Sequence, residues 1–222
     1  MRNPVPQRPQ PAVRQRVRIR FCKQGDLRFI GHRDLVRTME RLFRRAGLPL
    51  GMTQGFHPKP RMSFPAALAL GIEGLDEIME IELAREVAAD ALLRQLNDAS
   101  VPGLAFLRVD VLPPDAVGSR ARVTHVTYEI DVPADRRPDV ARRAAALRAL
   151  PTCPIRRPDR PDPLDLLEFL EDLKMDETVL SMTLRVTPQA NPGPRDVLAA
   201  LELDDLEREG SRLRRACVAA RT

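Results

Sequence analysis

The segment Val17-Arg18-Ile19-Arg20-Phe21 alternates strictly between apolar and basic residues. Successive side chains of a strand point to opposite faces, so the alternation predicts a strand with its apolar residues facing a core. The two arginines are expected on the other face. Residues 1–14, which precede this strand, are mostly Pro, Gln and Arg, and we expect them to form a disordered tail.

A helix is predicted from about Arg33 to Ala46, after a turn at Gly25-Asp26. Its apolar positions recur with helical spacing and are Leu35, Met39, Leu42, Phe43 and Ala46. Gly47 and Pro49 follow the last of these positions, where residues of these types commonly end a helix. The segment is therefore expected to be an amphipathic helix packed on the first strand.

The next segments complete a first predicted domain at residues 15–113. We expect strands at 62–72, 77–83 and 104–112, a helix at 87–99 and a loop at 51–61. Leu107, Val109 and Val111 are expected on one side of the last strand. The resulting order, βαββαβ, is typical of a ferredoxin-like sandwich, an antiparallel sheet with helices on one face.

A second, decorated ferredoxin-like domain is predicted at residues 120–222, after a linker at Pro113–Gly118. Its expected strands lie at 123–132, 179–186 and 211–218, and its expected helices at 140–150 and 194–203. The proline-rich stretch 151–163 is expected to be irregular. The fold class predicted from the sequence is therefore α+β, with two ferredoxin-like sandwiches in tandem.

Composition places the chain among globular proteins. Its 222 residues, 43% of them hydrophobic, are enough to bury a core without disulfides or a structural metal. The three cysteines, Cys22, Cys153 and Cys217, are odd in number and far apart, which fits a reducing compartment. The N-terminal residues have no apolar signal-peptide core, and no apolar run is long enough to span a bilayer. We therefore expect a cytoplasmic protein.

Positive charge is concentrated in the first third of the chain. Residues 1–61 contain 15 Lys and Arg but only three acids, a net charge of +12, whereas the remaining residues carry a net charge of −7. A surface with such a charge attracts polyanions. The first third is thus expected to bind an anionic partner, most plausibly RNA.

The first helix and the residues just before it carry a run of arginines. They are Arg28, Arg33, Arg37, Arg41, Arg44 and Arg45. Residues 37, 41 and 44 share one helical face, opposite the apolar stripe. One interpretation is a solvated helix face on which Glu40 pairs with Arg44. The other is an anion-binding face, favoured here because so few acids offset the arginines.

The loop that follows contains Phe56, His57, Lys59 and Arg61, with Lys59 between two prolines. Prolines stiffen the backbone and keep it extended. Cationic side chains beside one aromatic ring suit phosphate contacts and the stacking of an unpaired base. The alternative is a rigid crossover loop in which Phe56 simply belongs to the core.

His32 precedes the expected helix, where free main-chain N–H groups can bind an anion. It could cap the helix, bind a ligand or transfer a proton, the last with His57 as partner. No Cys-x-x-Cys pair, phosphate-binding Gly-rich fingerprint or Gly-x-Ser-x-Gly elbow is present. We therefore predict no catalytic residue, no metal site and no cofactor.

Several segments together resemble a bacterial family of radical-SAM-associated proteins that carry a domain of unknown function. The segments are 17–23, 27–34, 45–49, 54–60 and 69–72, and the resemblance is strongest over about residues 15–112. It implies a partnership with a radical S-adenosylmethionine enzyme and a link to RNA or ribosome biology. Family members often have Ser at the place of Gly31 and Asn at the place of His57, which argues against fixed catalytic roles there. This chain lacks cluster cysteines, so it would be the companion of the radical enzyme.

Three hypotheses for the function follow. The first is an accessory RNA-binding module that acts with a radical S-adenosylmethionine enzyme in RNA modification or ribosome biology. The second is a metal-independent RNA-processing enzyme that uses His32 and His57 as acid and base. The third is a protein-binding adaptor whose basic face docks on an acidic partner.

Overall fold

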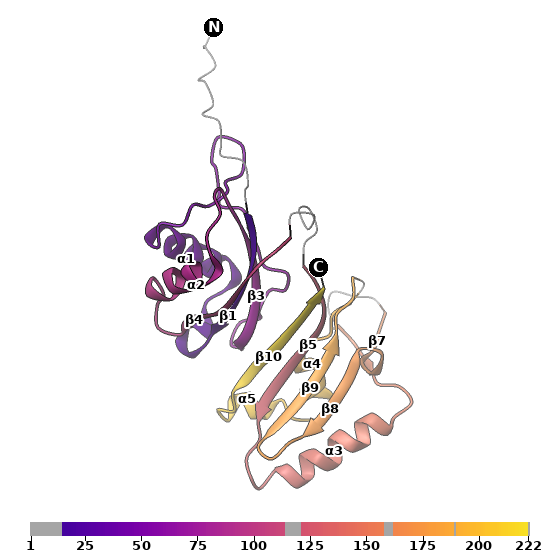
Figure 1. The fold of residues 1–222 in the computed structure, drawn as a ribbon. Coiled ribbons are helices and arrows are strands. Elements are labelled where there is room, and N and C mark those ends of the chain that lie inside the picture. The colour runs from indigo at the N-terminus through magenta and orange to yellow at the C-terminus, as the bar shows by residue number, and fades with distance from the viewer. Residues whose placement is uncertain (1–14, 114–120, 158–161, 189, 222) are drawn as a thin grey trace.

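The fold is built on one large, mostly antiparallel sheet with helices packed against it (Figure 1). The computed structural model describes residues 15–113, 121–157, 162–188 and 190–221. The predicted tail and most of the predicted linker lie outside these residues. The strands of the sheet are, in spatial order, β4 (Leu104–Val111), β1 (Gln15–Lys23), β3 (Glu73–Leu83), β10 (Leu213–Arg221), β5 (Arg122–Asp131), β9 (Val179–Arg185) and β8 (Leu170–Met175), with the short β2 (Met62–Ser63) on β3.

The first half of the protein, residues 15–113, confirms the opening prediction. Val17, Ile19 and Phe21 of β1 are fully buried. The 3₁₀ helix η1 (Gly25–Phe29) follows, and then α1 (His32–Arg45), which buries the predicted stripe except for Ala46, a half-buried residue just after the helix. Together with α2 (Ala89–Asp98), it covers one face of β4, β1 and β3 (Figure 1). The alternating strand and the amphipathic helix thus share one core.

The strand predicted at 62–72 is wrong beyond its first two residues. Only β2 pairs with β3, at Met62 and Ser63. Gly71 has a φ of +85°, and its N–H donates to the carbonyl of Arg28 at 2.9 Å. The carbonyls of Ala66 and Ala67 accept hydrogen bonds from a distant arginine. Ile72 is the one buried residue of this stretch. The backbone hydrogen bonds named here go to partners outside a strand ladder.

The face predicted for β4 is wrong at Leu107, whereas Val109 and Val111 share one face as predicted. Leu107 and Val111 are about half exposed, whereas Phe106 and Val109 are buried. Arg20 of β1 pairs with Arg108, but the next residue of β1 pairs with Phe106, so β4 carries one extra residue at this point. Such a bulge shifts the alternation by one residue. The sequence pattern alone gave no sign of it.

The second half, residues 121–221, contains strands predicted from the sequence and one that was missed. β5, β9 and β10 correspond to predicted strands, and the helices are α3 (Arg137–Ala149), α4 (Pro194–Ala200) and α5 (Asp205–Arg208). β8 was not predicted, although it forms a hairpin with β9. Within and just after the proline-rich stretch, β6 (Pro154–Ile155) and β7 (Leu164–Asp165) pair briefly before the 3₁₀ helix η3 (Leu166–Glu168). A second hydrophobic core fills this half.

The two halves meet where β10 pairs in parallel with the start of β3. At this seam the Nε of Arg215 donates to Oε1 of Glu77 at 2.7 Å, and its terminal nitrogens bond the second carboxylate oxygen and the carbonyls of Ala66 and Ala67. Arg215 and Glu77 are almost fully buried. A Cβ at Gly74 would lie 2.5 Å from the Glu77 side chain, so the pair requires a glycine there. The strands form one sheet, and a tandem arrangement of two ferredoxin-like units is not confirmed.

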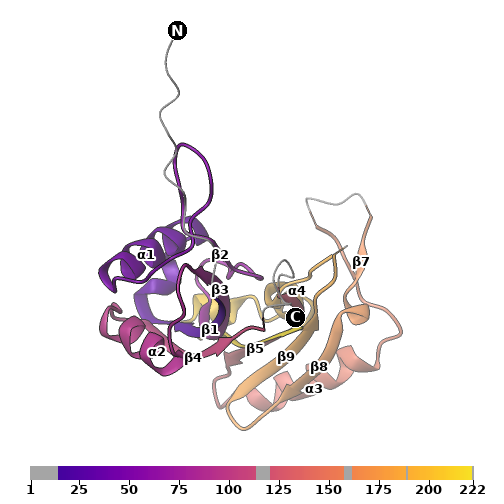
Figure 2. The same ribbon diagram turned by 45° about the horizontal axis from the view of Figure 1, so that its top comes forward.

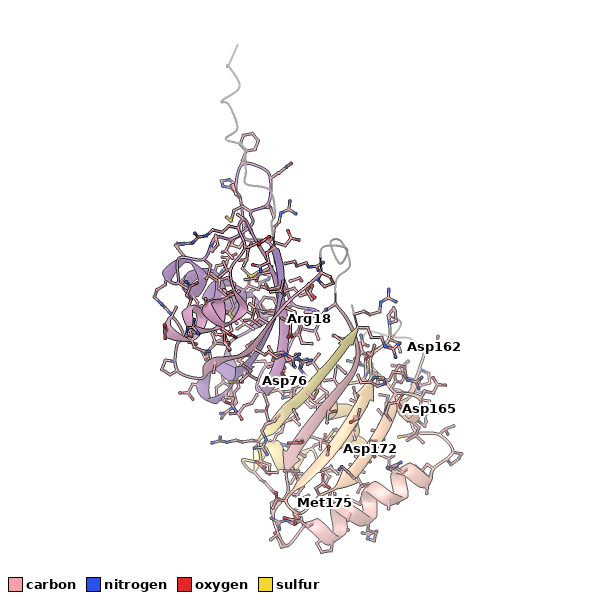
Figure 3. The ribbon with its side chains drawn as sticks, viewed as in Figure 1. Arg18, Asp76, Asp162, Asp165, Asp172 and Met175 are labelled. Carbon is pink, nitrogen blue, oxygen red and sulfur yellow. The ribbon has the colours of Figure 1, made fainter. Side chains whose placement is uncertain are left out.

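Further contacts join the halves beside this seam. Arg20 is ion-paired with Asp76, and one of its terminal nitrogens donates to the carbonyl of Val218 at 3.3 Å. In Figure 3, Arg18 and Asp76 lie on the side of the first half that is turned toward the second half. Ile78 of β3 packs in an apolar cluster with residues of β5 and β10. Ion pairs and apolar contacts therefore both hold the halves together.

We predict that Arg215→Met lowers the free energy of unfolding by about 3–5 kcal/mol, because it leaves the carboxylate of Glu77 buried without its cation. Glu77→Leu combined with Arg215→Met should recover part of this loss. Urea denaturation of both variants measures the effect. Arg108→Met, which removes the surface pair with Asp110, should cost less than about 1 kcal/mol. If Arg215→Met and Arg108→Met lower the free energy of unfolding equally, the role of the buried pair at the seam is contradicted.

The stability should depend on pH through Lys23, which is buried and donates from Nζ to the carbonyl of Ile30 at 3.0 Å. Burial lowers the pKa of Lys23 below its ordinary value of 10.5, against an opposing effect of Glu77. Between the lowered pKa and 10.5 the unfolded chain binds more protons than the folded one. The free energy of unfolding of the wild type should therefore rise with pH relative to Lys23→Met in this window. If urea denaturation gives the wild type and Lys23→Met the same dependence of the free energy of unfolding on pH, this prediction is contradicted.

Candidate nucleic-acid interface

A hairpin loop at residues 51–61 projects from the first half (Figures 1 and 2). Its two sides are joined by hydrogen bonds from the N–H of Thr53 to the carbonyl of Lys59 and from the N–H of Arg61 to the carbonyl of Gly51, both at 2.8 Å. The N–H of Gly51 and the carbonyl of Arg61 bond the backbone of Glu82 in β3. The loop is therefore a short extension of the sheet with a defined conformation.

The tip of the hairpin loop presents an aromatic ring to solvent. Phe56 is 96% exposed, so the interpretation that placed it in the core is wrong. Gly55 has a φ of +126°, a conformation that favours glycine and turns the chain at the tip. His57 and Lys59 are also exposed. Among the described residues the ammonium of Lys59 has no ion pair or hydrogen bond, so it is free to bind an anion.

The arginines of α1 differ in whether their guanidinium groups are bound by other groups of the protein. Arg45 bonds the carbonyl of Ala99. Arg37 lies 3.4 Å from Asp34, with both side chains mostly exposed, and Arg41 makes only a 3.4 Å contact with the hydroxyl of Thr38. The other two exposed arginines of the helix, Arg33 and Arg44, have no partner within the described ranges. The basic face of α1, formed by Arg33, Arg37, Arg41 and Arg44, is thus weakly compensated.

An open groove of about 570 Å³ separates the hairpin loop from the C-terminal half of α1. Its walls are largely apolar and are formed by Leu48, Pro49, Leu50, Met52, Pro58, Pro60 and Ala84. Arg44 and Glu40 line it from the helix, and Lys59 lines it from the hairpin loop. The ion pair between Glu40 and Arg44 that the sequence allowed is not formed. The groove therefore combines apolar walls with charged groups that have no ion-pair partner among the described residues.

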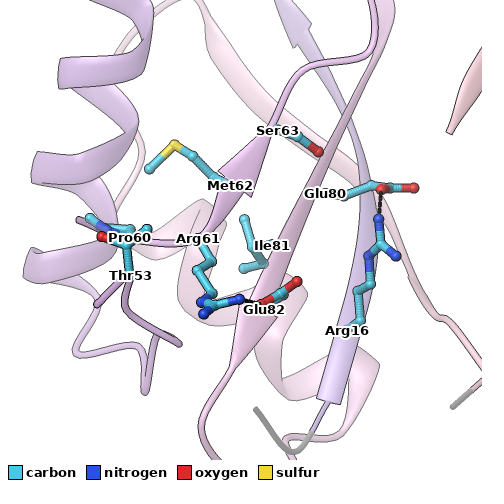
Figure 4. A pocket seen from close by; sticks show the side chains of 9 residues that line it. All are labelled: Arg16, Thr53, Pro60, Arg61, Met62, Ser63, Glu80, Ile81 and Glu82. Carbon is cyan, nitrogen blue, oxygen red and sulfur yellow. Dashed lines mark hydrogen bonds and ion pairs between the residues drawn. The ribbon is translucent and has the colours of Figure 1, made fainter. Parts of the chain in front are cut away.

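A second pocket, of about 340 Å³, lies on the other side of the base of the hairpin loop (Figure 4). Here the guanidinium of Arg61 lies 3.3 Å from the carboxylate of Glu82 and donates to the carbonyl of Met52 at 3.0 Å. Glu80, also in this pocket, is bound by Arg16 at 2.6 Å. Arg61, predicted to bind a partner, thus has a structural role at the base of the loop.

Arg28 and His32 lie at the opposite end of α1 from the groove. Arg28 donates to the carbonyl of Gly25 at 3.3 Å and lies over the ring of Phe29 at 4.3 Å. The ring of His32 makes an edge contact with Phe64, with centroids 5.4 Å apart. At 1.5 Å per helical residue, His32 is about 18 Å along the axis from Arg44, which borders the hairpin loop. The structure does not bring His32 and His57 together.

The sequence interpretation missed the groove itself. In the sequence, Glu40 is interpreted only as a partner of Arg44, and residues 48–50 of the apolar wall lie between the predicted helix and the predicted loop. Helical spacing places Glu40 and Arg44 side by side, but their position opposite the hairpin loop depends on tertiary packing. The helices that the structure describes are all too short or too polar to span a bilayer. No cluster of three or more His, Cys, Asp or Glu that could hold a metal occurs in the part of the chain that the structure describes.

Comparisons with known proteins give a family but no function. A family model described as "Uncharacterized protein conserved in bacteria (DUF2344)" matches residues 16–194. This description names no radical enzyme, so the partnership implied by the resemblance stays a prediction. No curated protein matches the chain. A crystal structure of an unknown protein from Galdieria sulphuraria aligns over 94% of this chain and 99% of its own, with 14% identity and a TM-score of 0.27.

Removing the side chain of Arg61 should loosen the hairpin loop without unfolding the protein. We predict that Arg61→Ala speeds hydrogen exchange of the backbone amides at positions 53 and 61. The global free energy of unfolding should fall by less than about 1 kcal/mol. Arg148→Ala, which removes a comparable pair with Asp172 in the second half, should leave exchange in the loop unchanged. Unchanged loop exchange in Arg61→Ala would contradict this role.

Proposed function

The chain belongs to the family of uncharacterized bacterial proteins DUF2344, and we propose that it is an accessory RNA-binding module. Its interface would consist of the hairpin loop and the basic face of α1. This proposal keeps the partner predicted from the sequence and narrows the residues that bind it. A radical S-adenosylmethionine enzyme acting on the same RNA remains the proposed protein partner, on the resemblance alone.

The observation that carries the proposal is the 96% exposure of Phe56 beside the uncompensated ammonium of Lys59. Full burial of a phenylalanine side chain is worth about 1.5–3 kcal/mol, so a ring held in water on an ordered hairpin loop favours a partner that covers it. Unpaired RNA bases offer flat faces for stacking, and the adjoining phosphates offer negative charge. One ligand thereby satisfies both features of the tip.

The basic face of α1 supplies the remaining phosphate contacts. Arg33, Arg37, Arg41 and Arg44 are exposed and weakly compensated, so binding a phosphate would cost them few existing interactions. Arg28, Arg45 and Arg61, also expected to bind RNA, are engaged by other groups. The proposed interface therefore has five main cations, the four arginines of the basic face and Lys59.

The tandem ferredoxin-like arrangement is retained as part of this proposal. The order β4-β1-β3-β2 in the first half and the order β10-β5-β9-β8 in the second both have antiparallel neighbours throughout. Along the chain, each half places a helix between its first two strands of the sheet and another before its last strand. These features support two related units, fused at β3 and β10. RNA-binding proteins use such units, but a shared fold alone does not imply a shared function.

The salt dependence of RNA binding tests the proposal. With five cations on a single strand, the slope of log affinity against log salt should be about −3.5, and Lys59→Ala should make it shallower by about 0.7. Phe56→Ala should weaken binding roughly tenfold with the slope unchanged, because stacking is not electrostatic. Fluorescence anisotropy with total cellular RNA and then with single-stranded oligonucleotides measures both quantities.

The matched control is Arg156→Ala, which removes an exposed arginine without a partner among the described residues, in the second half. It should leave affinity and slope unchanged. A slope near zero for the wild type, or Phe56→Ala and Lys59→Ala variants that bind as the wild type does, would refute RNA binding by this interface. The acidic surface of a protein would then become the partner to test.

A further inference from the structure

We propose that the groove between α1 and the hairpin loop binds an unpaired guanine base and that Glu40 recognises it. This inference rests on the proposed RNA-binding function and adds the class of substrate, a single strand with an unpaired guanine. Its starting point is the position of an acid where the surrounding surface is basic. Glu40 is one of three acids in the first 61 residues.

The walls of the groove suit a planar ring. Apolar side chains from the chain segment after α1 face prolines from the hairpin loop. The volume of about 570 Å³ falls in the range of small-molecule sites, which are mostly apolar with a few polar groups that fix orientation. A nucleobase inserted here would bury its faces against Met52 and Pro58, and leave its polar edge toward the helix.

The polar group that would meet this edge is Glu40. Its side chain is partly buried and has no ion pair or hydrogen bond among the described residues, although Arg44 lies one turn away. A carboxylate near phosphate-binding cations weakens phosphate binding, because like charges repel. It favours RNA only if it accepts hydrogen bonds from a base. Glu40 is therefore placed to select a base by its donors.

Guanine fits a carboxylate better than the other bases do. An ionised carboxylate only accepts hydrogen bonds, and it has two oxygens in a fork. The Watson–Crick edge of guanine presents two adjacent donors, the N1–H and the N2 amino group, so it can bond both oxygens at once. Adenine, cytosine and uracil each place an acceptor next to their donor, which would face the second oxygen and repel it.

The cations on either side of the groove fit the same strand. Arg44 lies on the helix wall and Lys59 on the loop wall, and neither side chain has a partner within the described ranges. They can neutralise the phosphates before and after the inserted base. Phe56 at the tip of the loop can then stack on a neighbouring base. The groove thus has a role for each of its charged groups.

The test compares an oligouridine of about eight nucleotides with the same strand carrying one central guanosine or one central inosine. Inosine lacks only the N2 amino group of guanosine. Wild-type protein should bind the guanosine strand about tenfold more tightly than the uridine strand, with the inosine strand between them. Glu40→Gln keeps the size of the side chain but removes one acceptor, so the preference should be lost while binding of oligouridine remains.

Asp34→Asn is the matched control, because it removes one negative charge from the same helix away from the groove. It should keep the guanosine preference. If the wild type binds all three strands equally and in a salt-dependent manner, guanine recognition is refuted while RNA binding stands. A guanosine preference that survives Glu40→Gln also refutes the role of Glu40. If no strand binds, the proposed function itself fails.

Discussion

The structure depends on the pairing of β3 with other strands along both of its edges. One edge pairs with β1 along nearly its whole length. The other edge pairs at its start with β10, through Glu73 and Gly74, and near its end with β2, through Glu80 and Ile81. Beyond this the backbone of Glu82 holds the base of the hairpin loop. A single strand thereby joins the second half to the first and sets the position of the proposed RNA-binding loop.

β3 combines these pairings with three buried carboxylates, those of Glu73, Glu77 and Glu80. Arg215 binds the second of them across the seam, and Arg16 and Arg18 bind the third. Buried ion pairs often add little net stability, but loss of one partner is costly because the other charge stays buried. We infer that these pairs mainly fix the register in which the strands pair. A shift of β10 along β3 would separate Arg215 from the carboxylate of Glu77.

The periodic parts of the fold were predictable from the sequence, and the parts fixed by distant partners were not. β1 and α1 each bury one regular stripe, so alternation and helical spacing identified them. The stretch from Pro65 to Ile72 is apolar, but the carbonyls of Ala66 and Ala67 bond Arg215, which lies far away in the chain. The bulge in β4 and the pairing of β8 with β9 likewise depend on neighbouring strands.

The candidate site was predictable in its composition but not in its geometry. The excess of arginines and the stiff Pro58-Lys59-Pro60 segment pointed to an anion-binding surface, and the exposure of Phe56 agrees with one of the two interpretations of the loop. Which cations are free depended on partners that only the fold supplies, such as Glu82 for Arg61 and Ala99 for Arg45. The groove and the isolation of Glu40 arise from packing between α1 and the loop.

RNA is proposed to contact the hairpin loop and the basic face of α1. Ultraviolet cross-linking of bound RNA, followed by mass spectrometry of the cross-linked peptides, tests this contact most directly. Cross-links should concentrate in residues 51–61, with Phe56 foremost, and in α1. Cross-links confined to the second half, for example to α3 or to β8 and β9, would contradict it.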